Sequence, residues 1–345
     1  MKLFIFGSTG DLVKRKVMKA LHEIYNSEEN LEIYAIGRKD LDRKEYQNFI
    51  CSDWCVPNFR KSIKYFKIDF EDLKFDNFKD KLDRDNENYF YVSLPPSEYG
   101  KILEFIEKIS NKGYKIKVLV EKPFGENMKE ALKLRKIIEE SGLKGNVFIS
   151  DHYLFKKRFM DLPEDFKRVK IVSVEKVGLE NRAGYYEGVG AMKDMIQSHF
   201  LNLVMKNMKF DIKPKDIKVE HFVKGQYKGY SDELRRKSST ETFVYVKFSC
   251  GGREFEFITG KAFDKKEGYV EISGRKYVMG DDNSYAEIFK RFLNLDRDLM
   301  KGFPTSCDSI NSWKIVEKLN DNFNGKLAIY NKGVNLKDLI AQKNS

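Results

Sequence analysis

Short apolar segments alternate with stretches of helical spacing over the first 150 residues, and this alternation constrains the fold more than any other feature. The first apolar run, at residues 2–6, ends at a glycine turn, and apolar residues then recur at helical spacing over 12–25. Further strands are predicted at 31–37, 64–68, 89–94, 116–120 and 146–150, and further helices over 42–50, 97–111 and 127–141. Such alternation favours a parallel sheet with helices on both faces. We therefore expect residues 1–150 to form a Rossmann-like α/β domain.

The pattern changes after residue 150. Long β-type segments are separated by glycine turns there, at residues 170–177, 242–250, 254–263 and 269–280. A chain of 345 residues is also longer than one hydrophobic core usually supports. We expect residues 151–345 to form a second, α+β domain with a large, mainly antiparallel sheet.

The chain is basic, with a net charge of +11 and a pI of about 9.1, a balance that attracts phosphate, nucleic acid or anionic lipid. Its lysines are spread almost evenly, whereas nucleic-acid-binding proteins gather them beside stacking aromatic residues. We therefore expect solvated helix faces that attract an anionic ligand in a general way, and no nucleic-acid partner.

The apolar runs are too short to cross a bilayer, and the N-terminus lacks the residue succession of a secretory signal. These features predict a cytoplasmic protein with no membrane partner. The four cysteines are Cys51, Cys55, Cys250 and Cys307, and no pair has the two-residue spacing of a zinc site. We expect reduced thiols and no bound metal.

The turn after the first strand reads "GSTGDLVKRK", residues 7–16. Gly7 can take a positive φ, Gly10 lets the backbone approach a ligand, and the free amides at the helix start can bind pyrophosphate. A purely structural turn would have the same glycines, because the spacing is not the full dinucleotide fingerprint. In the cofactor interpretation, the contacts come from the first six residues of the turn: Gly7, Ser8, Thr9, Gly10, Asp11 and Leu12.

The end of the second strand indicates which dinucleotide is bound. NAD sites usually place an acidic residue there for the ribose hydroxyls, whereas this strand ends in "GRKD". Arg38 and Lys39 stand where the 2′-phosphate of NADP would lie. We predict NADP as the cofactor, with NAD possible and two solvated basic residues as the structural alternative.

His199 is one of only four histidines in the chain. On α-helical spacing it shares an apolar face with Met192, Met195, Ile196 and Leu203, which is typical of a hydrogen-bonded core histidine. The alternative is that His199 is the base of an active site.

A base needs a partner that orients it. Asp194 precedes His199 by five residues, a rotation of about 140° on an α-helix, so it is poorly placed for this role. The segment "SDHYLFKK", residues 150–157, follows a predicted parallel strand, at the edge where open α/β sheets bind ligands. Asp151 could orient His199, while His152, Tyr153 and Lys156 could donate hydrogen bonds to a phosphate.

Six segments of the chain together resemble the glucose-6-phosphate dehydrogenase family, because they occur in the same order and with nearly the same residues. They are "GSTGDLVKRK", "VEKPFGENM", "DHYLFKK", "RAGYYEGVGAMKDMIQSHFLN", "GQYKGY" and "ITGKAFDKKEGYVEI". The later "YAEIFKRFL" and "SINSWKIVEKL" are similar to the closing helices of that family. The resemblance spans almost the whole chain and implies a dehydrogenase that oxidises glucose 6-phosphate to 6-phosphoglucono-δ-lactone with NADP, within glucose metabolism and the pentose phosphate pathway.

The resemblance also implies roles for individual residues. His199 corresponds to the general base and Asp151 to the carboxylate that orients it. The other matched positions are substrate residues: His152, Tyr153 and Lys156 for the phosphate, Glu175 and Asp194 for glucose hydroxyls, and Lys122, Lys261 and Lys266 as basic groups. Lys122 also lies near the cofactor in the family, Pro123 marks the hinge between domains, and Arg38 matches, more loosely, an arginine at the 2′-phosphate. Residues 1–150 would then bind NADP, and 151–345 would bind the sugar and support a homodimer or larger homo-oligomer.

The chain departs from the family pattern in two ways. It is shorter, mostly after the "GKAF" segment and in the loop before "GYSDEL", which leaves the oligomer open. Phe155 replaces the glycine beside the phosphate-binding lysine, and its ring could narrow the pocket.

Two alternatives to the glucose-6-phosphate activity therefore stay open. The chain could be a dehydrogenase of another sugar or sugar phosphate, or a paralogue that binds NADP or sugar phosphate without turnover. Retention of both Asp151 and His199 argues against the paralogue, because binding alone does not require a base and its orienting group.

Overall fold

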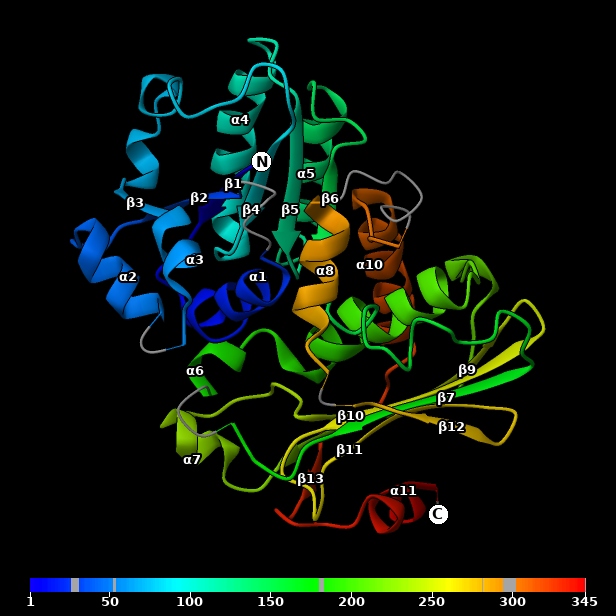
Figure 1. Cartoon of the computed structure of the whole chain (residues 1–345). Helices are drawn as coiled ribbons and strands as arrows, with labels where there is room; N and C mark the ends of the chain where they lie inside the picture. Colours follow the sequence, from blue (N-terminus) through cyan, green and yellow to red (C-terminus); the bar gives the residue numbers. More distant parts are fainter. Residues whose placement is uncertain (26–30, 52–53, 180–182, 281, 294–301, 345) are drawn as a thin grey trace. The chain divides into compact units, whose positions relative to one another are not determined.

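The computed structural model describes residues 1–25, 31–51, 54–179, 183–280, 282–293 and 302–344. The chain forms two compact units (Figure 1). Unit 1 consists of residues 1–155 and 283–307, and unit 2 of residues 156–282 and 308–345. The second half of the chain is thus not one contiguous body, because residues 283–307 belong to unit 1.

Unit 1 is built on a six-stranded parallel sheet in the order β3-β2-β1-β4-β5-β6. The strands are β1 (Lys2–Phe6), β2 (Glu32–Gly37), β3 (Ile63–Lys67), β4 (Asn88–Val92), β5 (Ile116–Glu121) and β6 (Val147–Ser150). This is the doubly wound order in which ligands bind at the carboxyl ends of the strands, where the order reverses between β1 and β4. The Rossmann-like α/β fold predicted for this part of the chain is confirmed.

Helices cover the sheet of unit 1, at 13–24, 43–51, 99–110 and 128–139 where the sequence predicts them and also at 57–62 and 284–293. They are η1 (Val13–Val17, a π-helix), α1 (Met18–Ile24), α2 (Arg43–Cys51), α3 (Pro57–Ser62), α4 (Tyr99–Ser110), α5 (Met128–Glu139) and, from late in the chain, α8 (Ser284–Leu293). α4 buries Ile102, Phe105, Ile106 and Ile109, the spacing of an amphipathic helix. α5 begins where the Asn127 side chain accepts the backbone N–H of Glu130 at 3.0 Å.

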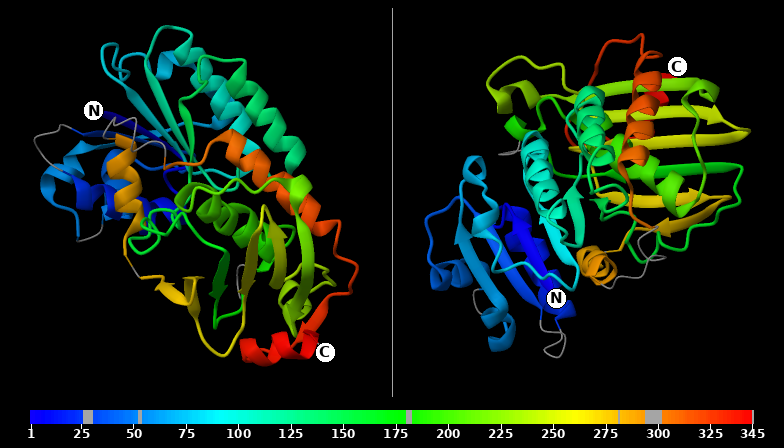
Figure 2. Two further views of the ribbon diagram at one scale, coloured as in Figure 1. Left: turned by 90° about the vertical axis from the view of Figure 1, so that its right-hand side faces the viewer. Right: turned by 90° about the horizontal axis from the view of Figure 1, so that it is seen from above.

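Unit 2 is built on a seven-stranded sheet in the order β12-β11-β7-β10-β9-β8-β13, whose strands lie side by side in Figure 2. The strands are β7 (Arg168–Val174), β8 (Lys218–Tyr227), β9 (Phe243–Cys250), β10 (Arg253–Gly260), β11 (Glu267–Ile272), β12 (Arg275–Val278) and β13 (Ala328–Tyr330). Only the β10–β7 and β13–β8 pairs are parallel. The predicted mainly antiparallel sheet of an α+β fold is confirmed.

The remaining elements of unit 2 are helices and turns. They are α6 (Ala183–Tyr186), the π-helices η7 (Met192–Phe200) and η8 (Leu203–Asn207), α7 (Tyr230–Leu234), α10 (Ser306–Asn320) and α11 (Leu336–Asn344). η7 packs on β10, where the rings of Phe200 and Phe257 meet edge to face at 5.6 Å. This packing fixes η7 against the middle of the sheet.

The cysteine prediction was wrong for one pair. Cys51 and Cys55 form a disulfide, whereas Cys250 and Cys307 are free. Zinc spacing was the wrong criterion here, because Cys51 ends α2 and its Cα lies 5.2 Å from that of Cys55, within reach of a disulfide.

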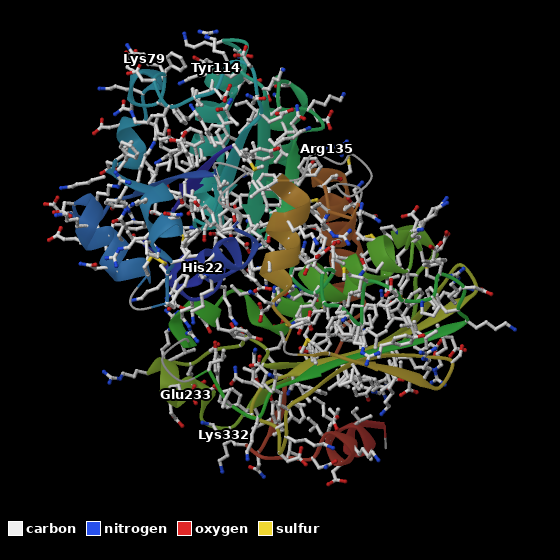
Figure 3. The ribbon with its side chains drawn as sticks, viewed as in Figure 1. His22, Lys79, Tyr114, Arg135, Glu233 and Lys332 are labelled. Atoms are coloured by element: carbon white, nitrogen blue, oxygen red, sulfur yellow. A yellow bond between two sulfur atoms is a disulfide. The ribbon has the colours of Figure 1, made fainter. Side chains whose placement is uncertain are left out.

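His22, labelled in Figure 3, lies on α1. Its Nε2 accepts the backbone N–H of Val56, and its ring packs edge to face on Trp54 and Phe59. His22 therefore joins α1 to the start of α3.

Within the described residues, no helix has the length and apolar character needed to cross a membrane.

Candidate active site

The glycine turn lies at the carboxyl end of β1, where the strand order of unit 1 reverses. Gly7 has a φ of +79°, and a Cβ at this position would lie 2.1 Å from the Ser93 carbonyl oxygen. The turn is closed by the Gly10 N–H, which donates to the Gly7 carbonyl at 3.0 Å. Only glycine fits at position 7, because any side chain would collide with the chain leaving β4.

The same turn fits a dinucleotide phosphate. Ser8 is fully buried, and its hydroxyl oxygen has no hydrogen-bond partner within the described part of the chain. Thr9 is half-buried, whereas Gly10 and Asp11 are exposed, and Asp11 forms an exposed ion pair with Arg15. An unpaired buried hydroxyl next to the helix start is a group that a phosphate oxygen would satisfy.

Basic side chains gather beside this turn at the end of β2. Arg38 is exposed, with its guanidinium 5.8 Å from the centre of the Phe70 ring. The ammonium groups of Lys14 and Lys39 lie 4.3 and 4.7 Å from the centre of the Phe49 ring. The prediction from sequence missed Lys14, although it belongs to the quoted turn segment, because helical spacing alone does not show that it meets Lys39 over one ring.

A buried carboxyl group lies at the carboxyl end of β5, directly before Lys122. The Tyr91 hydroxyl donates to Glu121 Oε1 at 2.6 Å and the Tyr285 hydroxyl to Oε2 at 3.5 Å, while Tyr99 donates to the Glu121 carbonyl at 2.6 Å. Burial is the main reason that the pKa of Glu121 is raised above its usual value. Three tyrosines thus hold Glu121, two through its carboxylate and one through its carbonyl, directly before Lys122, whose peptide bond to Pro123 is cis.

The "DHYLFKK" segment begins at the end of β6. Asp151 is fully buried, and its Oδ1 accepts the backbone N–H of Tyr153 at 3.0 Å. The His152 ring lies parallel to the Tyr285 ring, with 6.0 Å between ring centres, and packs edge to face on Tyr153. α8 therefore supplies a tyrosine that contacts both His152 and Glu121, which the sequence did not indicate.

Phe155 is buried within unit 1. Its ring is 3% exposed, packs 4.7 Å from the Phe303 ring and lies under the Arg291 guanidinium. Burial of this ring argues against the interpretation that it narrows the sugar pocket. The ring packs in unit 1 with Phe303 and Arg291.

In unit 2, Lys156 is held beside the residues that follow β12. Its ammonium donates to the carbonyls of Gly280 and Asp282, both at 3.1 Å, and lies 3.9 Å from Asp282 Oδ1. Asp282 Oδ2 also accepts the backbone N–H of Lys157. The Lys156 ammonium is thus held by two carbonyl oxygens and a carboxylate, and a phosphate would compete with these for it.

Three of the predicted sugar residues meet in unit 2. The buried Lys261 ammonium lies 2.8 Å from Glu175 Oε2 and 4.0 Å from Asp194 Oδ2. Glu175 is fixed through its backbone, which pairs with Gly260 and Phe263. Lys266 is exposed and takes no part in these ion pairs. We call Lys261, Glu175 and Asp194 the lysine–carboxylate cluster; its charged donor and two acceptors suit sugar hydroxyls.

His199 lies on η7 and is 1% exposed, with its neighbours Met192, Met195 and Ile196 also buried. The 140° rotation expected between Asp194 and His199 was wrong, because residues 192–200 form a π-helix. In a π-helix, hydrogen bonds join residues five apart. Asp194 and His199 are therefore about one turn apart and lie on nearly the same face of the helix. Asp151 and His199 belong to different units, and their pairing stays a prediction.

Comparison with known proteins follows the same division of the chain. The sequence model of "Glucose-6-phosphate dehydrogenase, NAD binding domain" matches residues 4–160, and that of the C-terminal domain matches 163–211, together more than half of the chain. The glucose-6-phosphate 1-dehydrogenase of Borreliella burgdorferi is 28% identical, and the alignment covers 82% of this chain and 73% of the relative. The Bacillus subtilis enzyme is 25% identical with the same coverage.

The fold is shared with a solved structure. A solved structure of a glucose-6-phosphate dehydrogenase in complex with its substrate glucose 6-phosphate superposes with a TM-score of 0.79. The match covers 99% of this chain and 96% of that one at 18% identity, so the two chains share nearly their whole fold. The chain belongs to the glucose-6-phosphate dehydrogenase family.

Proposed function

We propose that the protein oxidises glucose 6-phosphate to 6-phosphoglucono-δ-lactone and transfers the hydride to NADP. The observation that carries the proposal is the burial of both Asp151 and His199, at 0% and 1% exposure, within two motifs of the family. Burial gives an imidazole a defined orientation and removes it from competing water.

His199 is the proposed general base. A neutral imidazole has a pKa suited to accepting the C1 hydroxyl proton near neutral pH, as the C1–H bond breaks and its electron pair leaves as hydride. NADP, when bound, accepts that hydride. Asp151 would fix the imidazole tautomer and stabilise the imidazolium that forms, the role of the aspartate in a catalytic triad.

The remaining predicted residues would bind and orient the two ligands. His152, Tyr153 and Lys156 would hold the sugar phosphate, where each charged hydrogen bond contributes about 1.5 to 3 kcal/mol. The lysine–carboxylate cluster would bind glucose hydroxyls, with Lys266 and Lys122 as further basic groups. Residues from Gly7 to Leu12 would bind the dinucleotide, and Arg38, with Lys14 and Lys39, its 2′-phosphate.

The test is formation of reduced nicotinamide by the purified protein with glucose 6-phosphate, with NADP and NAD in parallel. The proposal predicts turnover with a preference for NADP. K39E should shift the preference toward NAD, whereas K133E, at an exposed position of α5, should not. Absence of turnover by folded protein that binds NADP would contradict the proposed substrate.

A dehydrogenase of another sugar phosphate is the second candidate, tested by the same assay with other hexose 6-phosphates. Phe155, the residue that favoured it, lies in the core of unit 1 and no longer supports it. We further propose, from the family resemblance, a cytoplasmic homodimer or larger homo-oligomer that acts in the pentose phosphate pathway.

A further inference from the structure

The hydroxyl of Tyr186 is the starting point. Tyr186 ends α6, is 3% exposed, and packs in the apolar cluster of unit 2 that includes Val174, Leu179 and Ala262. Its hydroxyl oxygen is buried and finds no hydrogen-bond partner among the residues that the structure describes. Buried hydroxyls are almost always paired, because leaving water without a new partner costs free energy.

Three other tyrosines of this cluster, Tyr227, Tyr230 and Tyr330, have hydrogen-bonded hydroxyls. Tyr227 donates to Glu233 Oε2 at 2.6 Å, and Glu233 in turn pairs with Lys332 (Figure 3). Tyr230 donates to Glu187 Oε2 at 3.0 Å, and Tyr330 donates to the Lys261 carbonyl at 2.8 Å. Among the described residues, Tyr186 is the tyrosine of this cluster whose fully buried hydroxyl has no hydrogen-bond partner.

Tyr186 lies next to the lysine–carboxylate cluster. The Lys261 ammonium is 5.9 Å from the centre of the Tyr186 ring. Burial, and after it the negative charge of Asp194, raises the pKa of Tyr186 well above its usual value. The phenol therefore keeps its proton and can only gain a partner by donating to an acceptor or accepting from a donor.

We propose that Tyr186 is a specificity-determining residue whose hydroxyl bonds to one sugar hydroxyl held by the lysine–carboxylate cluster. The inference rests on the proposed function and extends it to a residue that the sequence did not single out. A sugar hydroxyl can bond to the Lys261 ammonium or to the Glu175 carboxylate in place of the ion pair between them. A sugar bound in this way has a hydroxyl beside the Tyr186 phenol.

A bond of this kind discriminates between sugars. A sugar that lacks the hydroxyl leaves the buried phenol unpaired, so a site built around it rejects that sugar. Loss of one neutral hydrogen bond corresponds to about a 3- to 10-fold weaker complex. Y186F should therefore raise KM for glucose 6-phosphate by that factor without lowering the melting temperature, because it removes a hydroxyl that has no partner in the unliganded chain.

The experiment compares wild type and Y186F on glucose 6-phosphate and on its 2-, 3- and 4-deoxy analogues. The proposal predicts that the Y186F penalty disappears with one analogue and persists with the other two. Y230F is the matched control: it removes a paired hydroxyl of the same cluster, and should lower the melting temperature while the ratios of kcat/KM among the four sugars stay constant.

Two results would overturn the inference: an unchanged KM of Y186F for glucose 6-phosphate, or an equal penalty with all four sugars. Turnover of glucose 6-phosphate by the wild-type protein is the separate readout for the proposed function. Its absence would overturn both, whereas wild-type turnover with an insensitive Y186F would overturn the role of Tyr186 alone.

Discussion

Substitution of Gly7 by alanine is expected to damage both folding and cofactor binding. The residue has a φ of +79°, and its new Cβ would lie 2.1 Å from the Ser93 carbonyl oxygen. The left-handed conformation costs about 1 to 2 kcal/mol for an L-residue. Relief of the contact requires a backbone shift near the end of β4, at about 1 to 3 kcal/mol more. We expect a loss of about 2 to 5 kcal/mol in the free energy of unfolding.

Gly113 provides a matched control in the same unit. It also has a positive φ, of +87°, but a Cβ there meets nothing within 4 Å. G113A should therefore cost only the conformational part, about 1 to 2 kcal/mol, and leave NADP affinity unchanged. Urea unfolding and fluorescence titration with NADP measure both quantities. Equal losses of stability in G7A and G113A, or an NADP dissociation constant of G7A within about threefold of wild type, would refute the argument.

Three further predictions follow from the buried groups. Burial raises the pKa of Glu121 above its unfolded value of 4.5, so the folded state binds more protons and the free energy of unfolding falls as pH rises from 4.5 through the folded pKa. E121Q should remove this pH dependence from melting temperatures measured at several pH values. An unchanged pH dependence in E121Q would contradict the prediction. Reduction of the Cys51–Cys55 disulfide should cost about 2 kcal/mol for so short a loop, visible as a lower melting temperature with a thiol reductant, and C51S/C55S should be insensitive to that reductant. F155L should lower the free energy of unfolding by about 1 to 3 kcal/mol but leave KM for glucose 6-phosphate unchanged. A changed KM would show that the Phe155 ring influences the sugar pocket.

The sequence predicted the parallel sheet of unit 1 well because its strands are apolar throughout and bounded by glycine or polar residues. It missed β8, whose residues "KVEHFVKGQY" mix charge with apolar side chains, since this strand is half-exposed along most of its length. It also missed that α8 belongs to unit 1. Periodicity describes a helix locally, but which sheet the helix covers depends on contacts far apart in the sequence, such as Tyr285 with Glu121.

Among the candidate site residues, the sequence could identify chemical types but not environments. The meeting of Lys261 with Glu175 and Asp194 joins segments 19 to 86 residues apart, and only the fold brings them together. The π-helical form of η7 could not be read from apolar spacing, because α- and π-helices bury similar patterns over two turns. Tyr186 carried no sequence signal at all, since its interest lies in a partner that it lacks within the described structure.

The role of His199 as the base oriented by Asp151 is the central claim, and turnover by H199A and D151N tests it most directly. Rates of NADP reduction with saturating glucose 6-phosphate would be measured beside NADP affinity and melting temperature. We expect H199A to lose about 10² to 10⁴ in kcat, D151N to lose a large part of the same factor, and both variants to bind NADP as wild type does. A folded H199A with wild-type kcat would remove His199 from the mechanism and contradict the account.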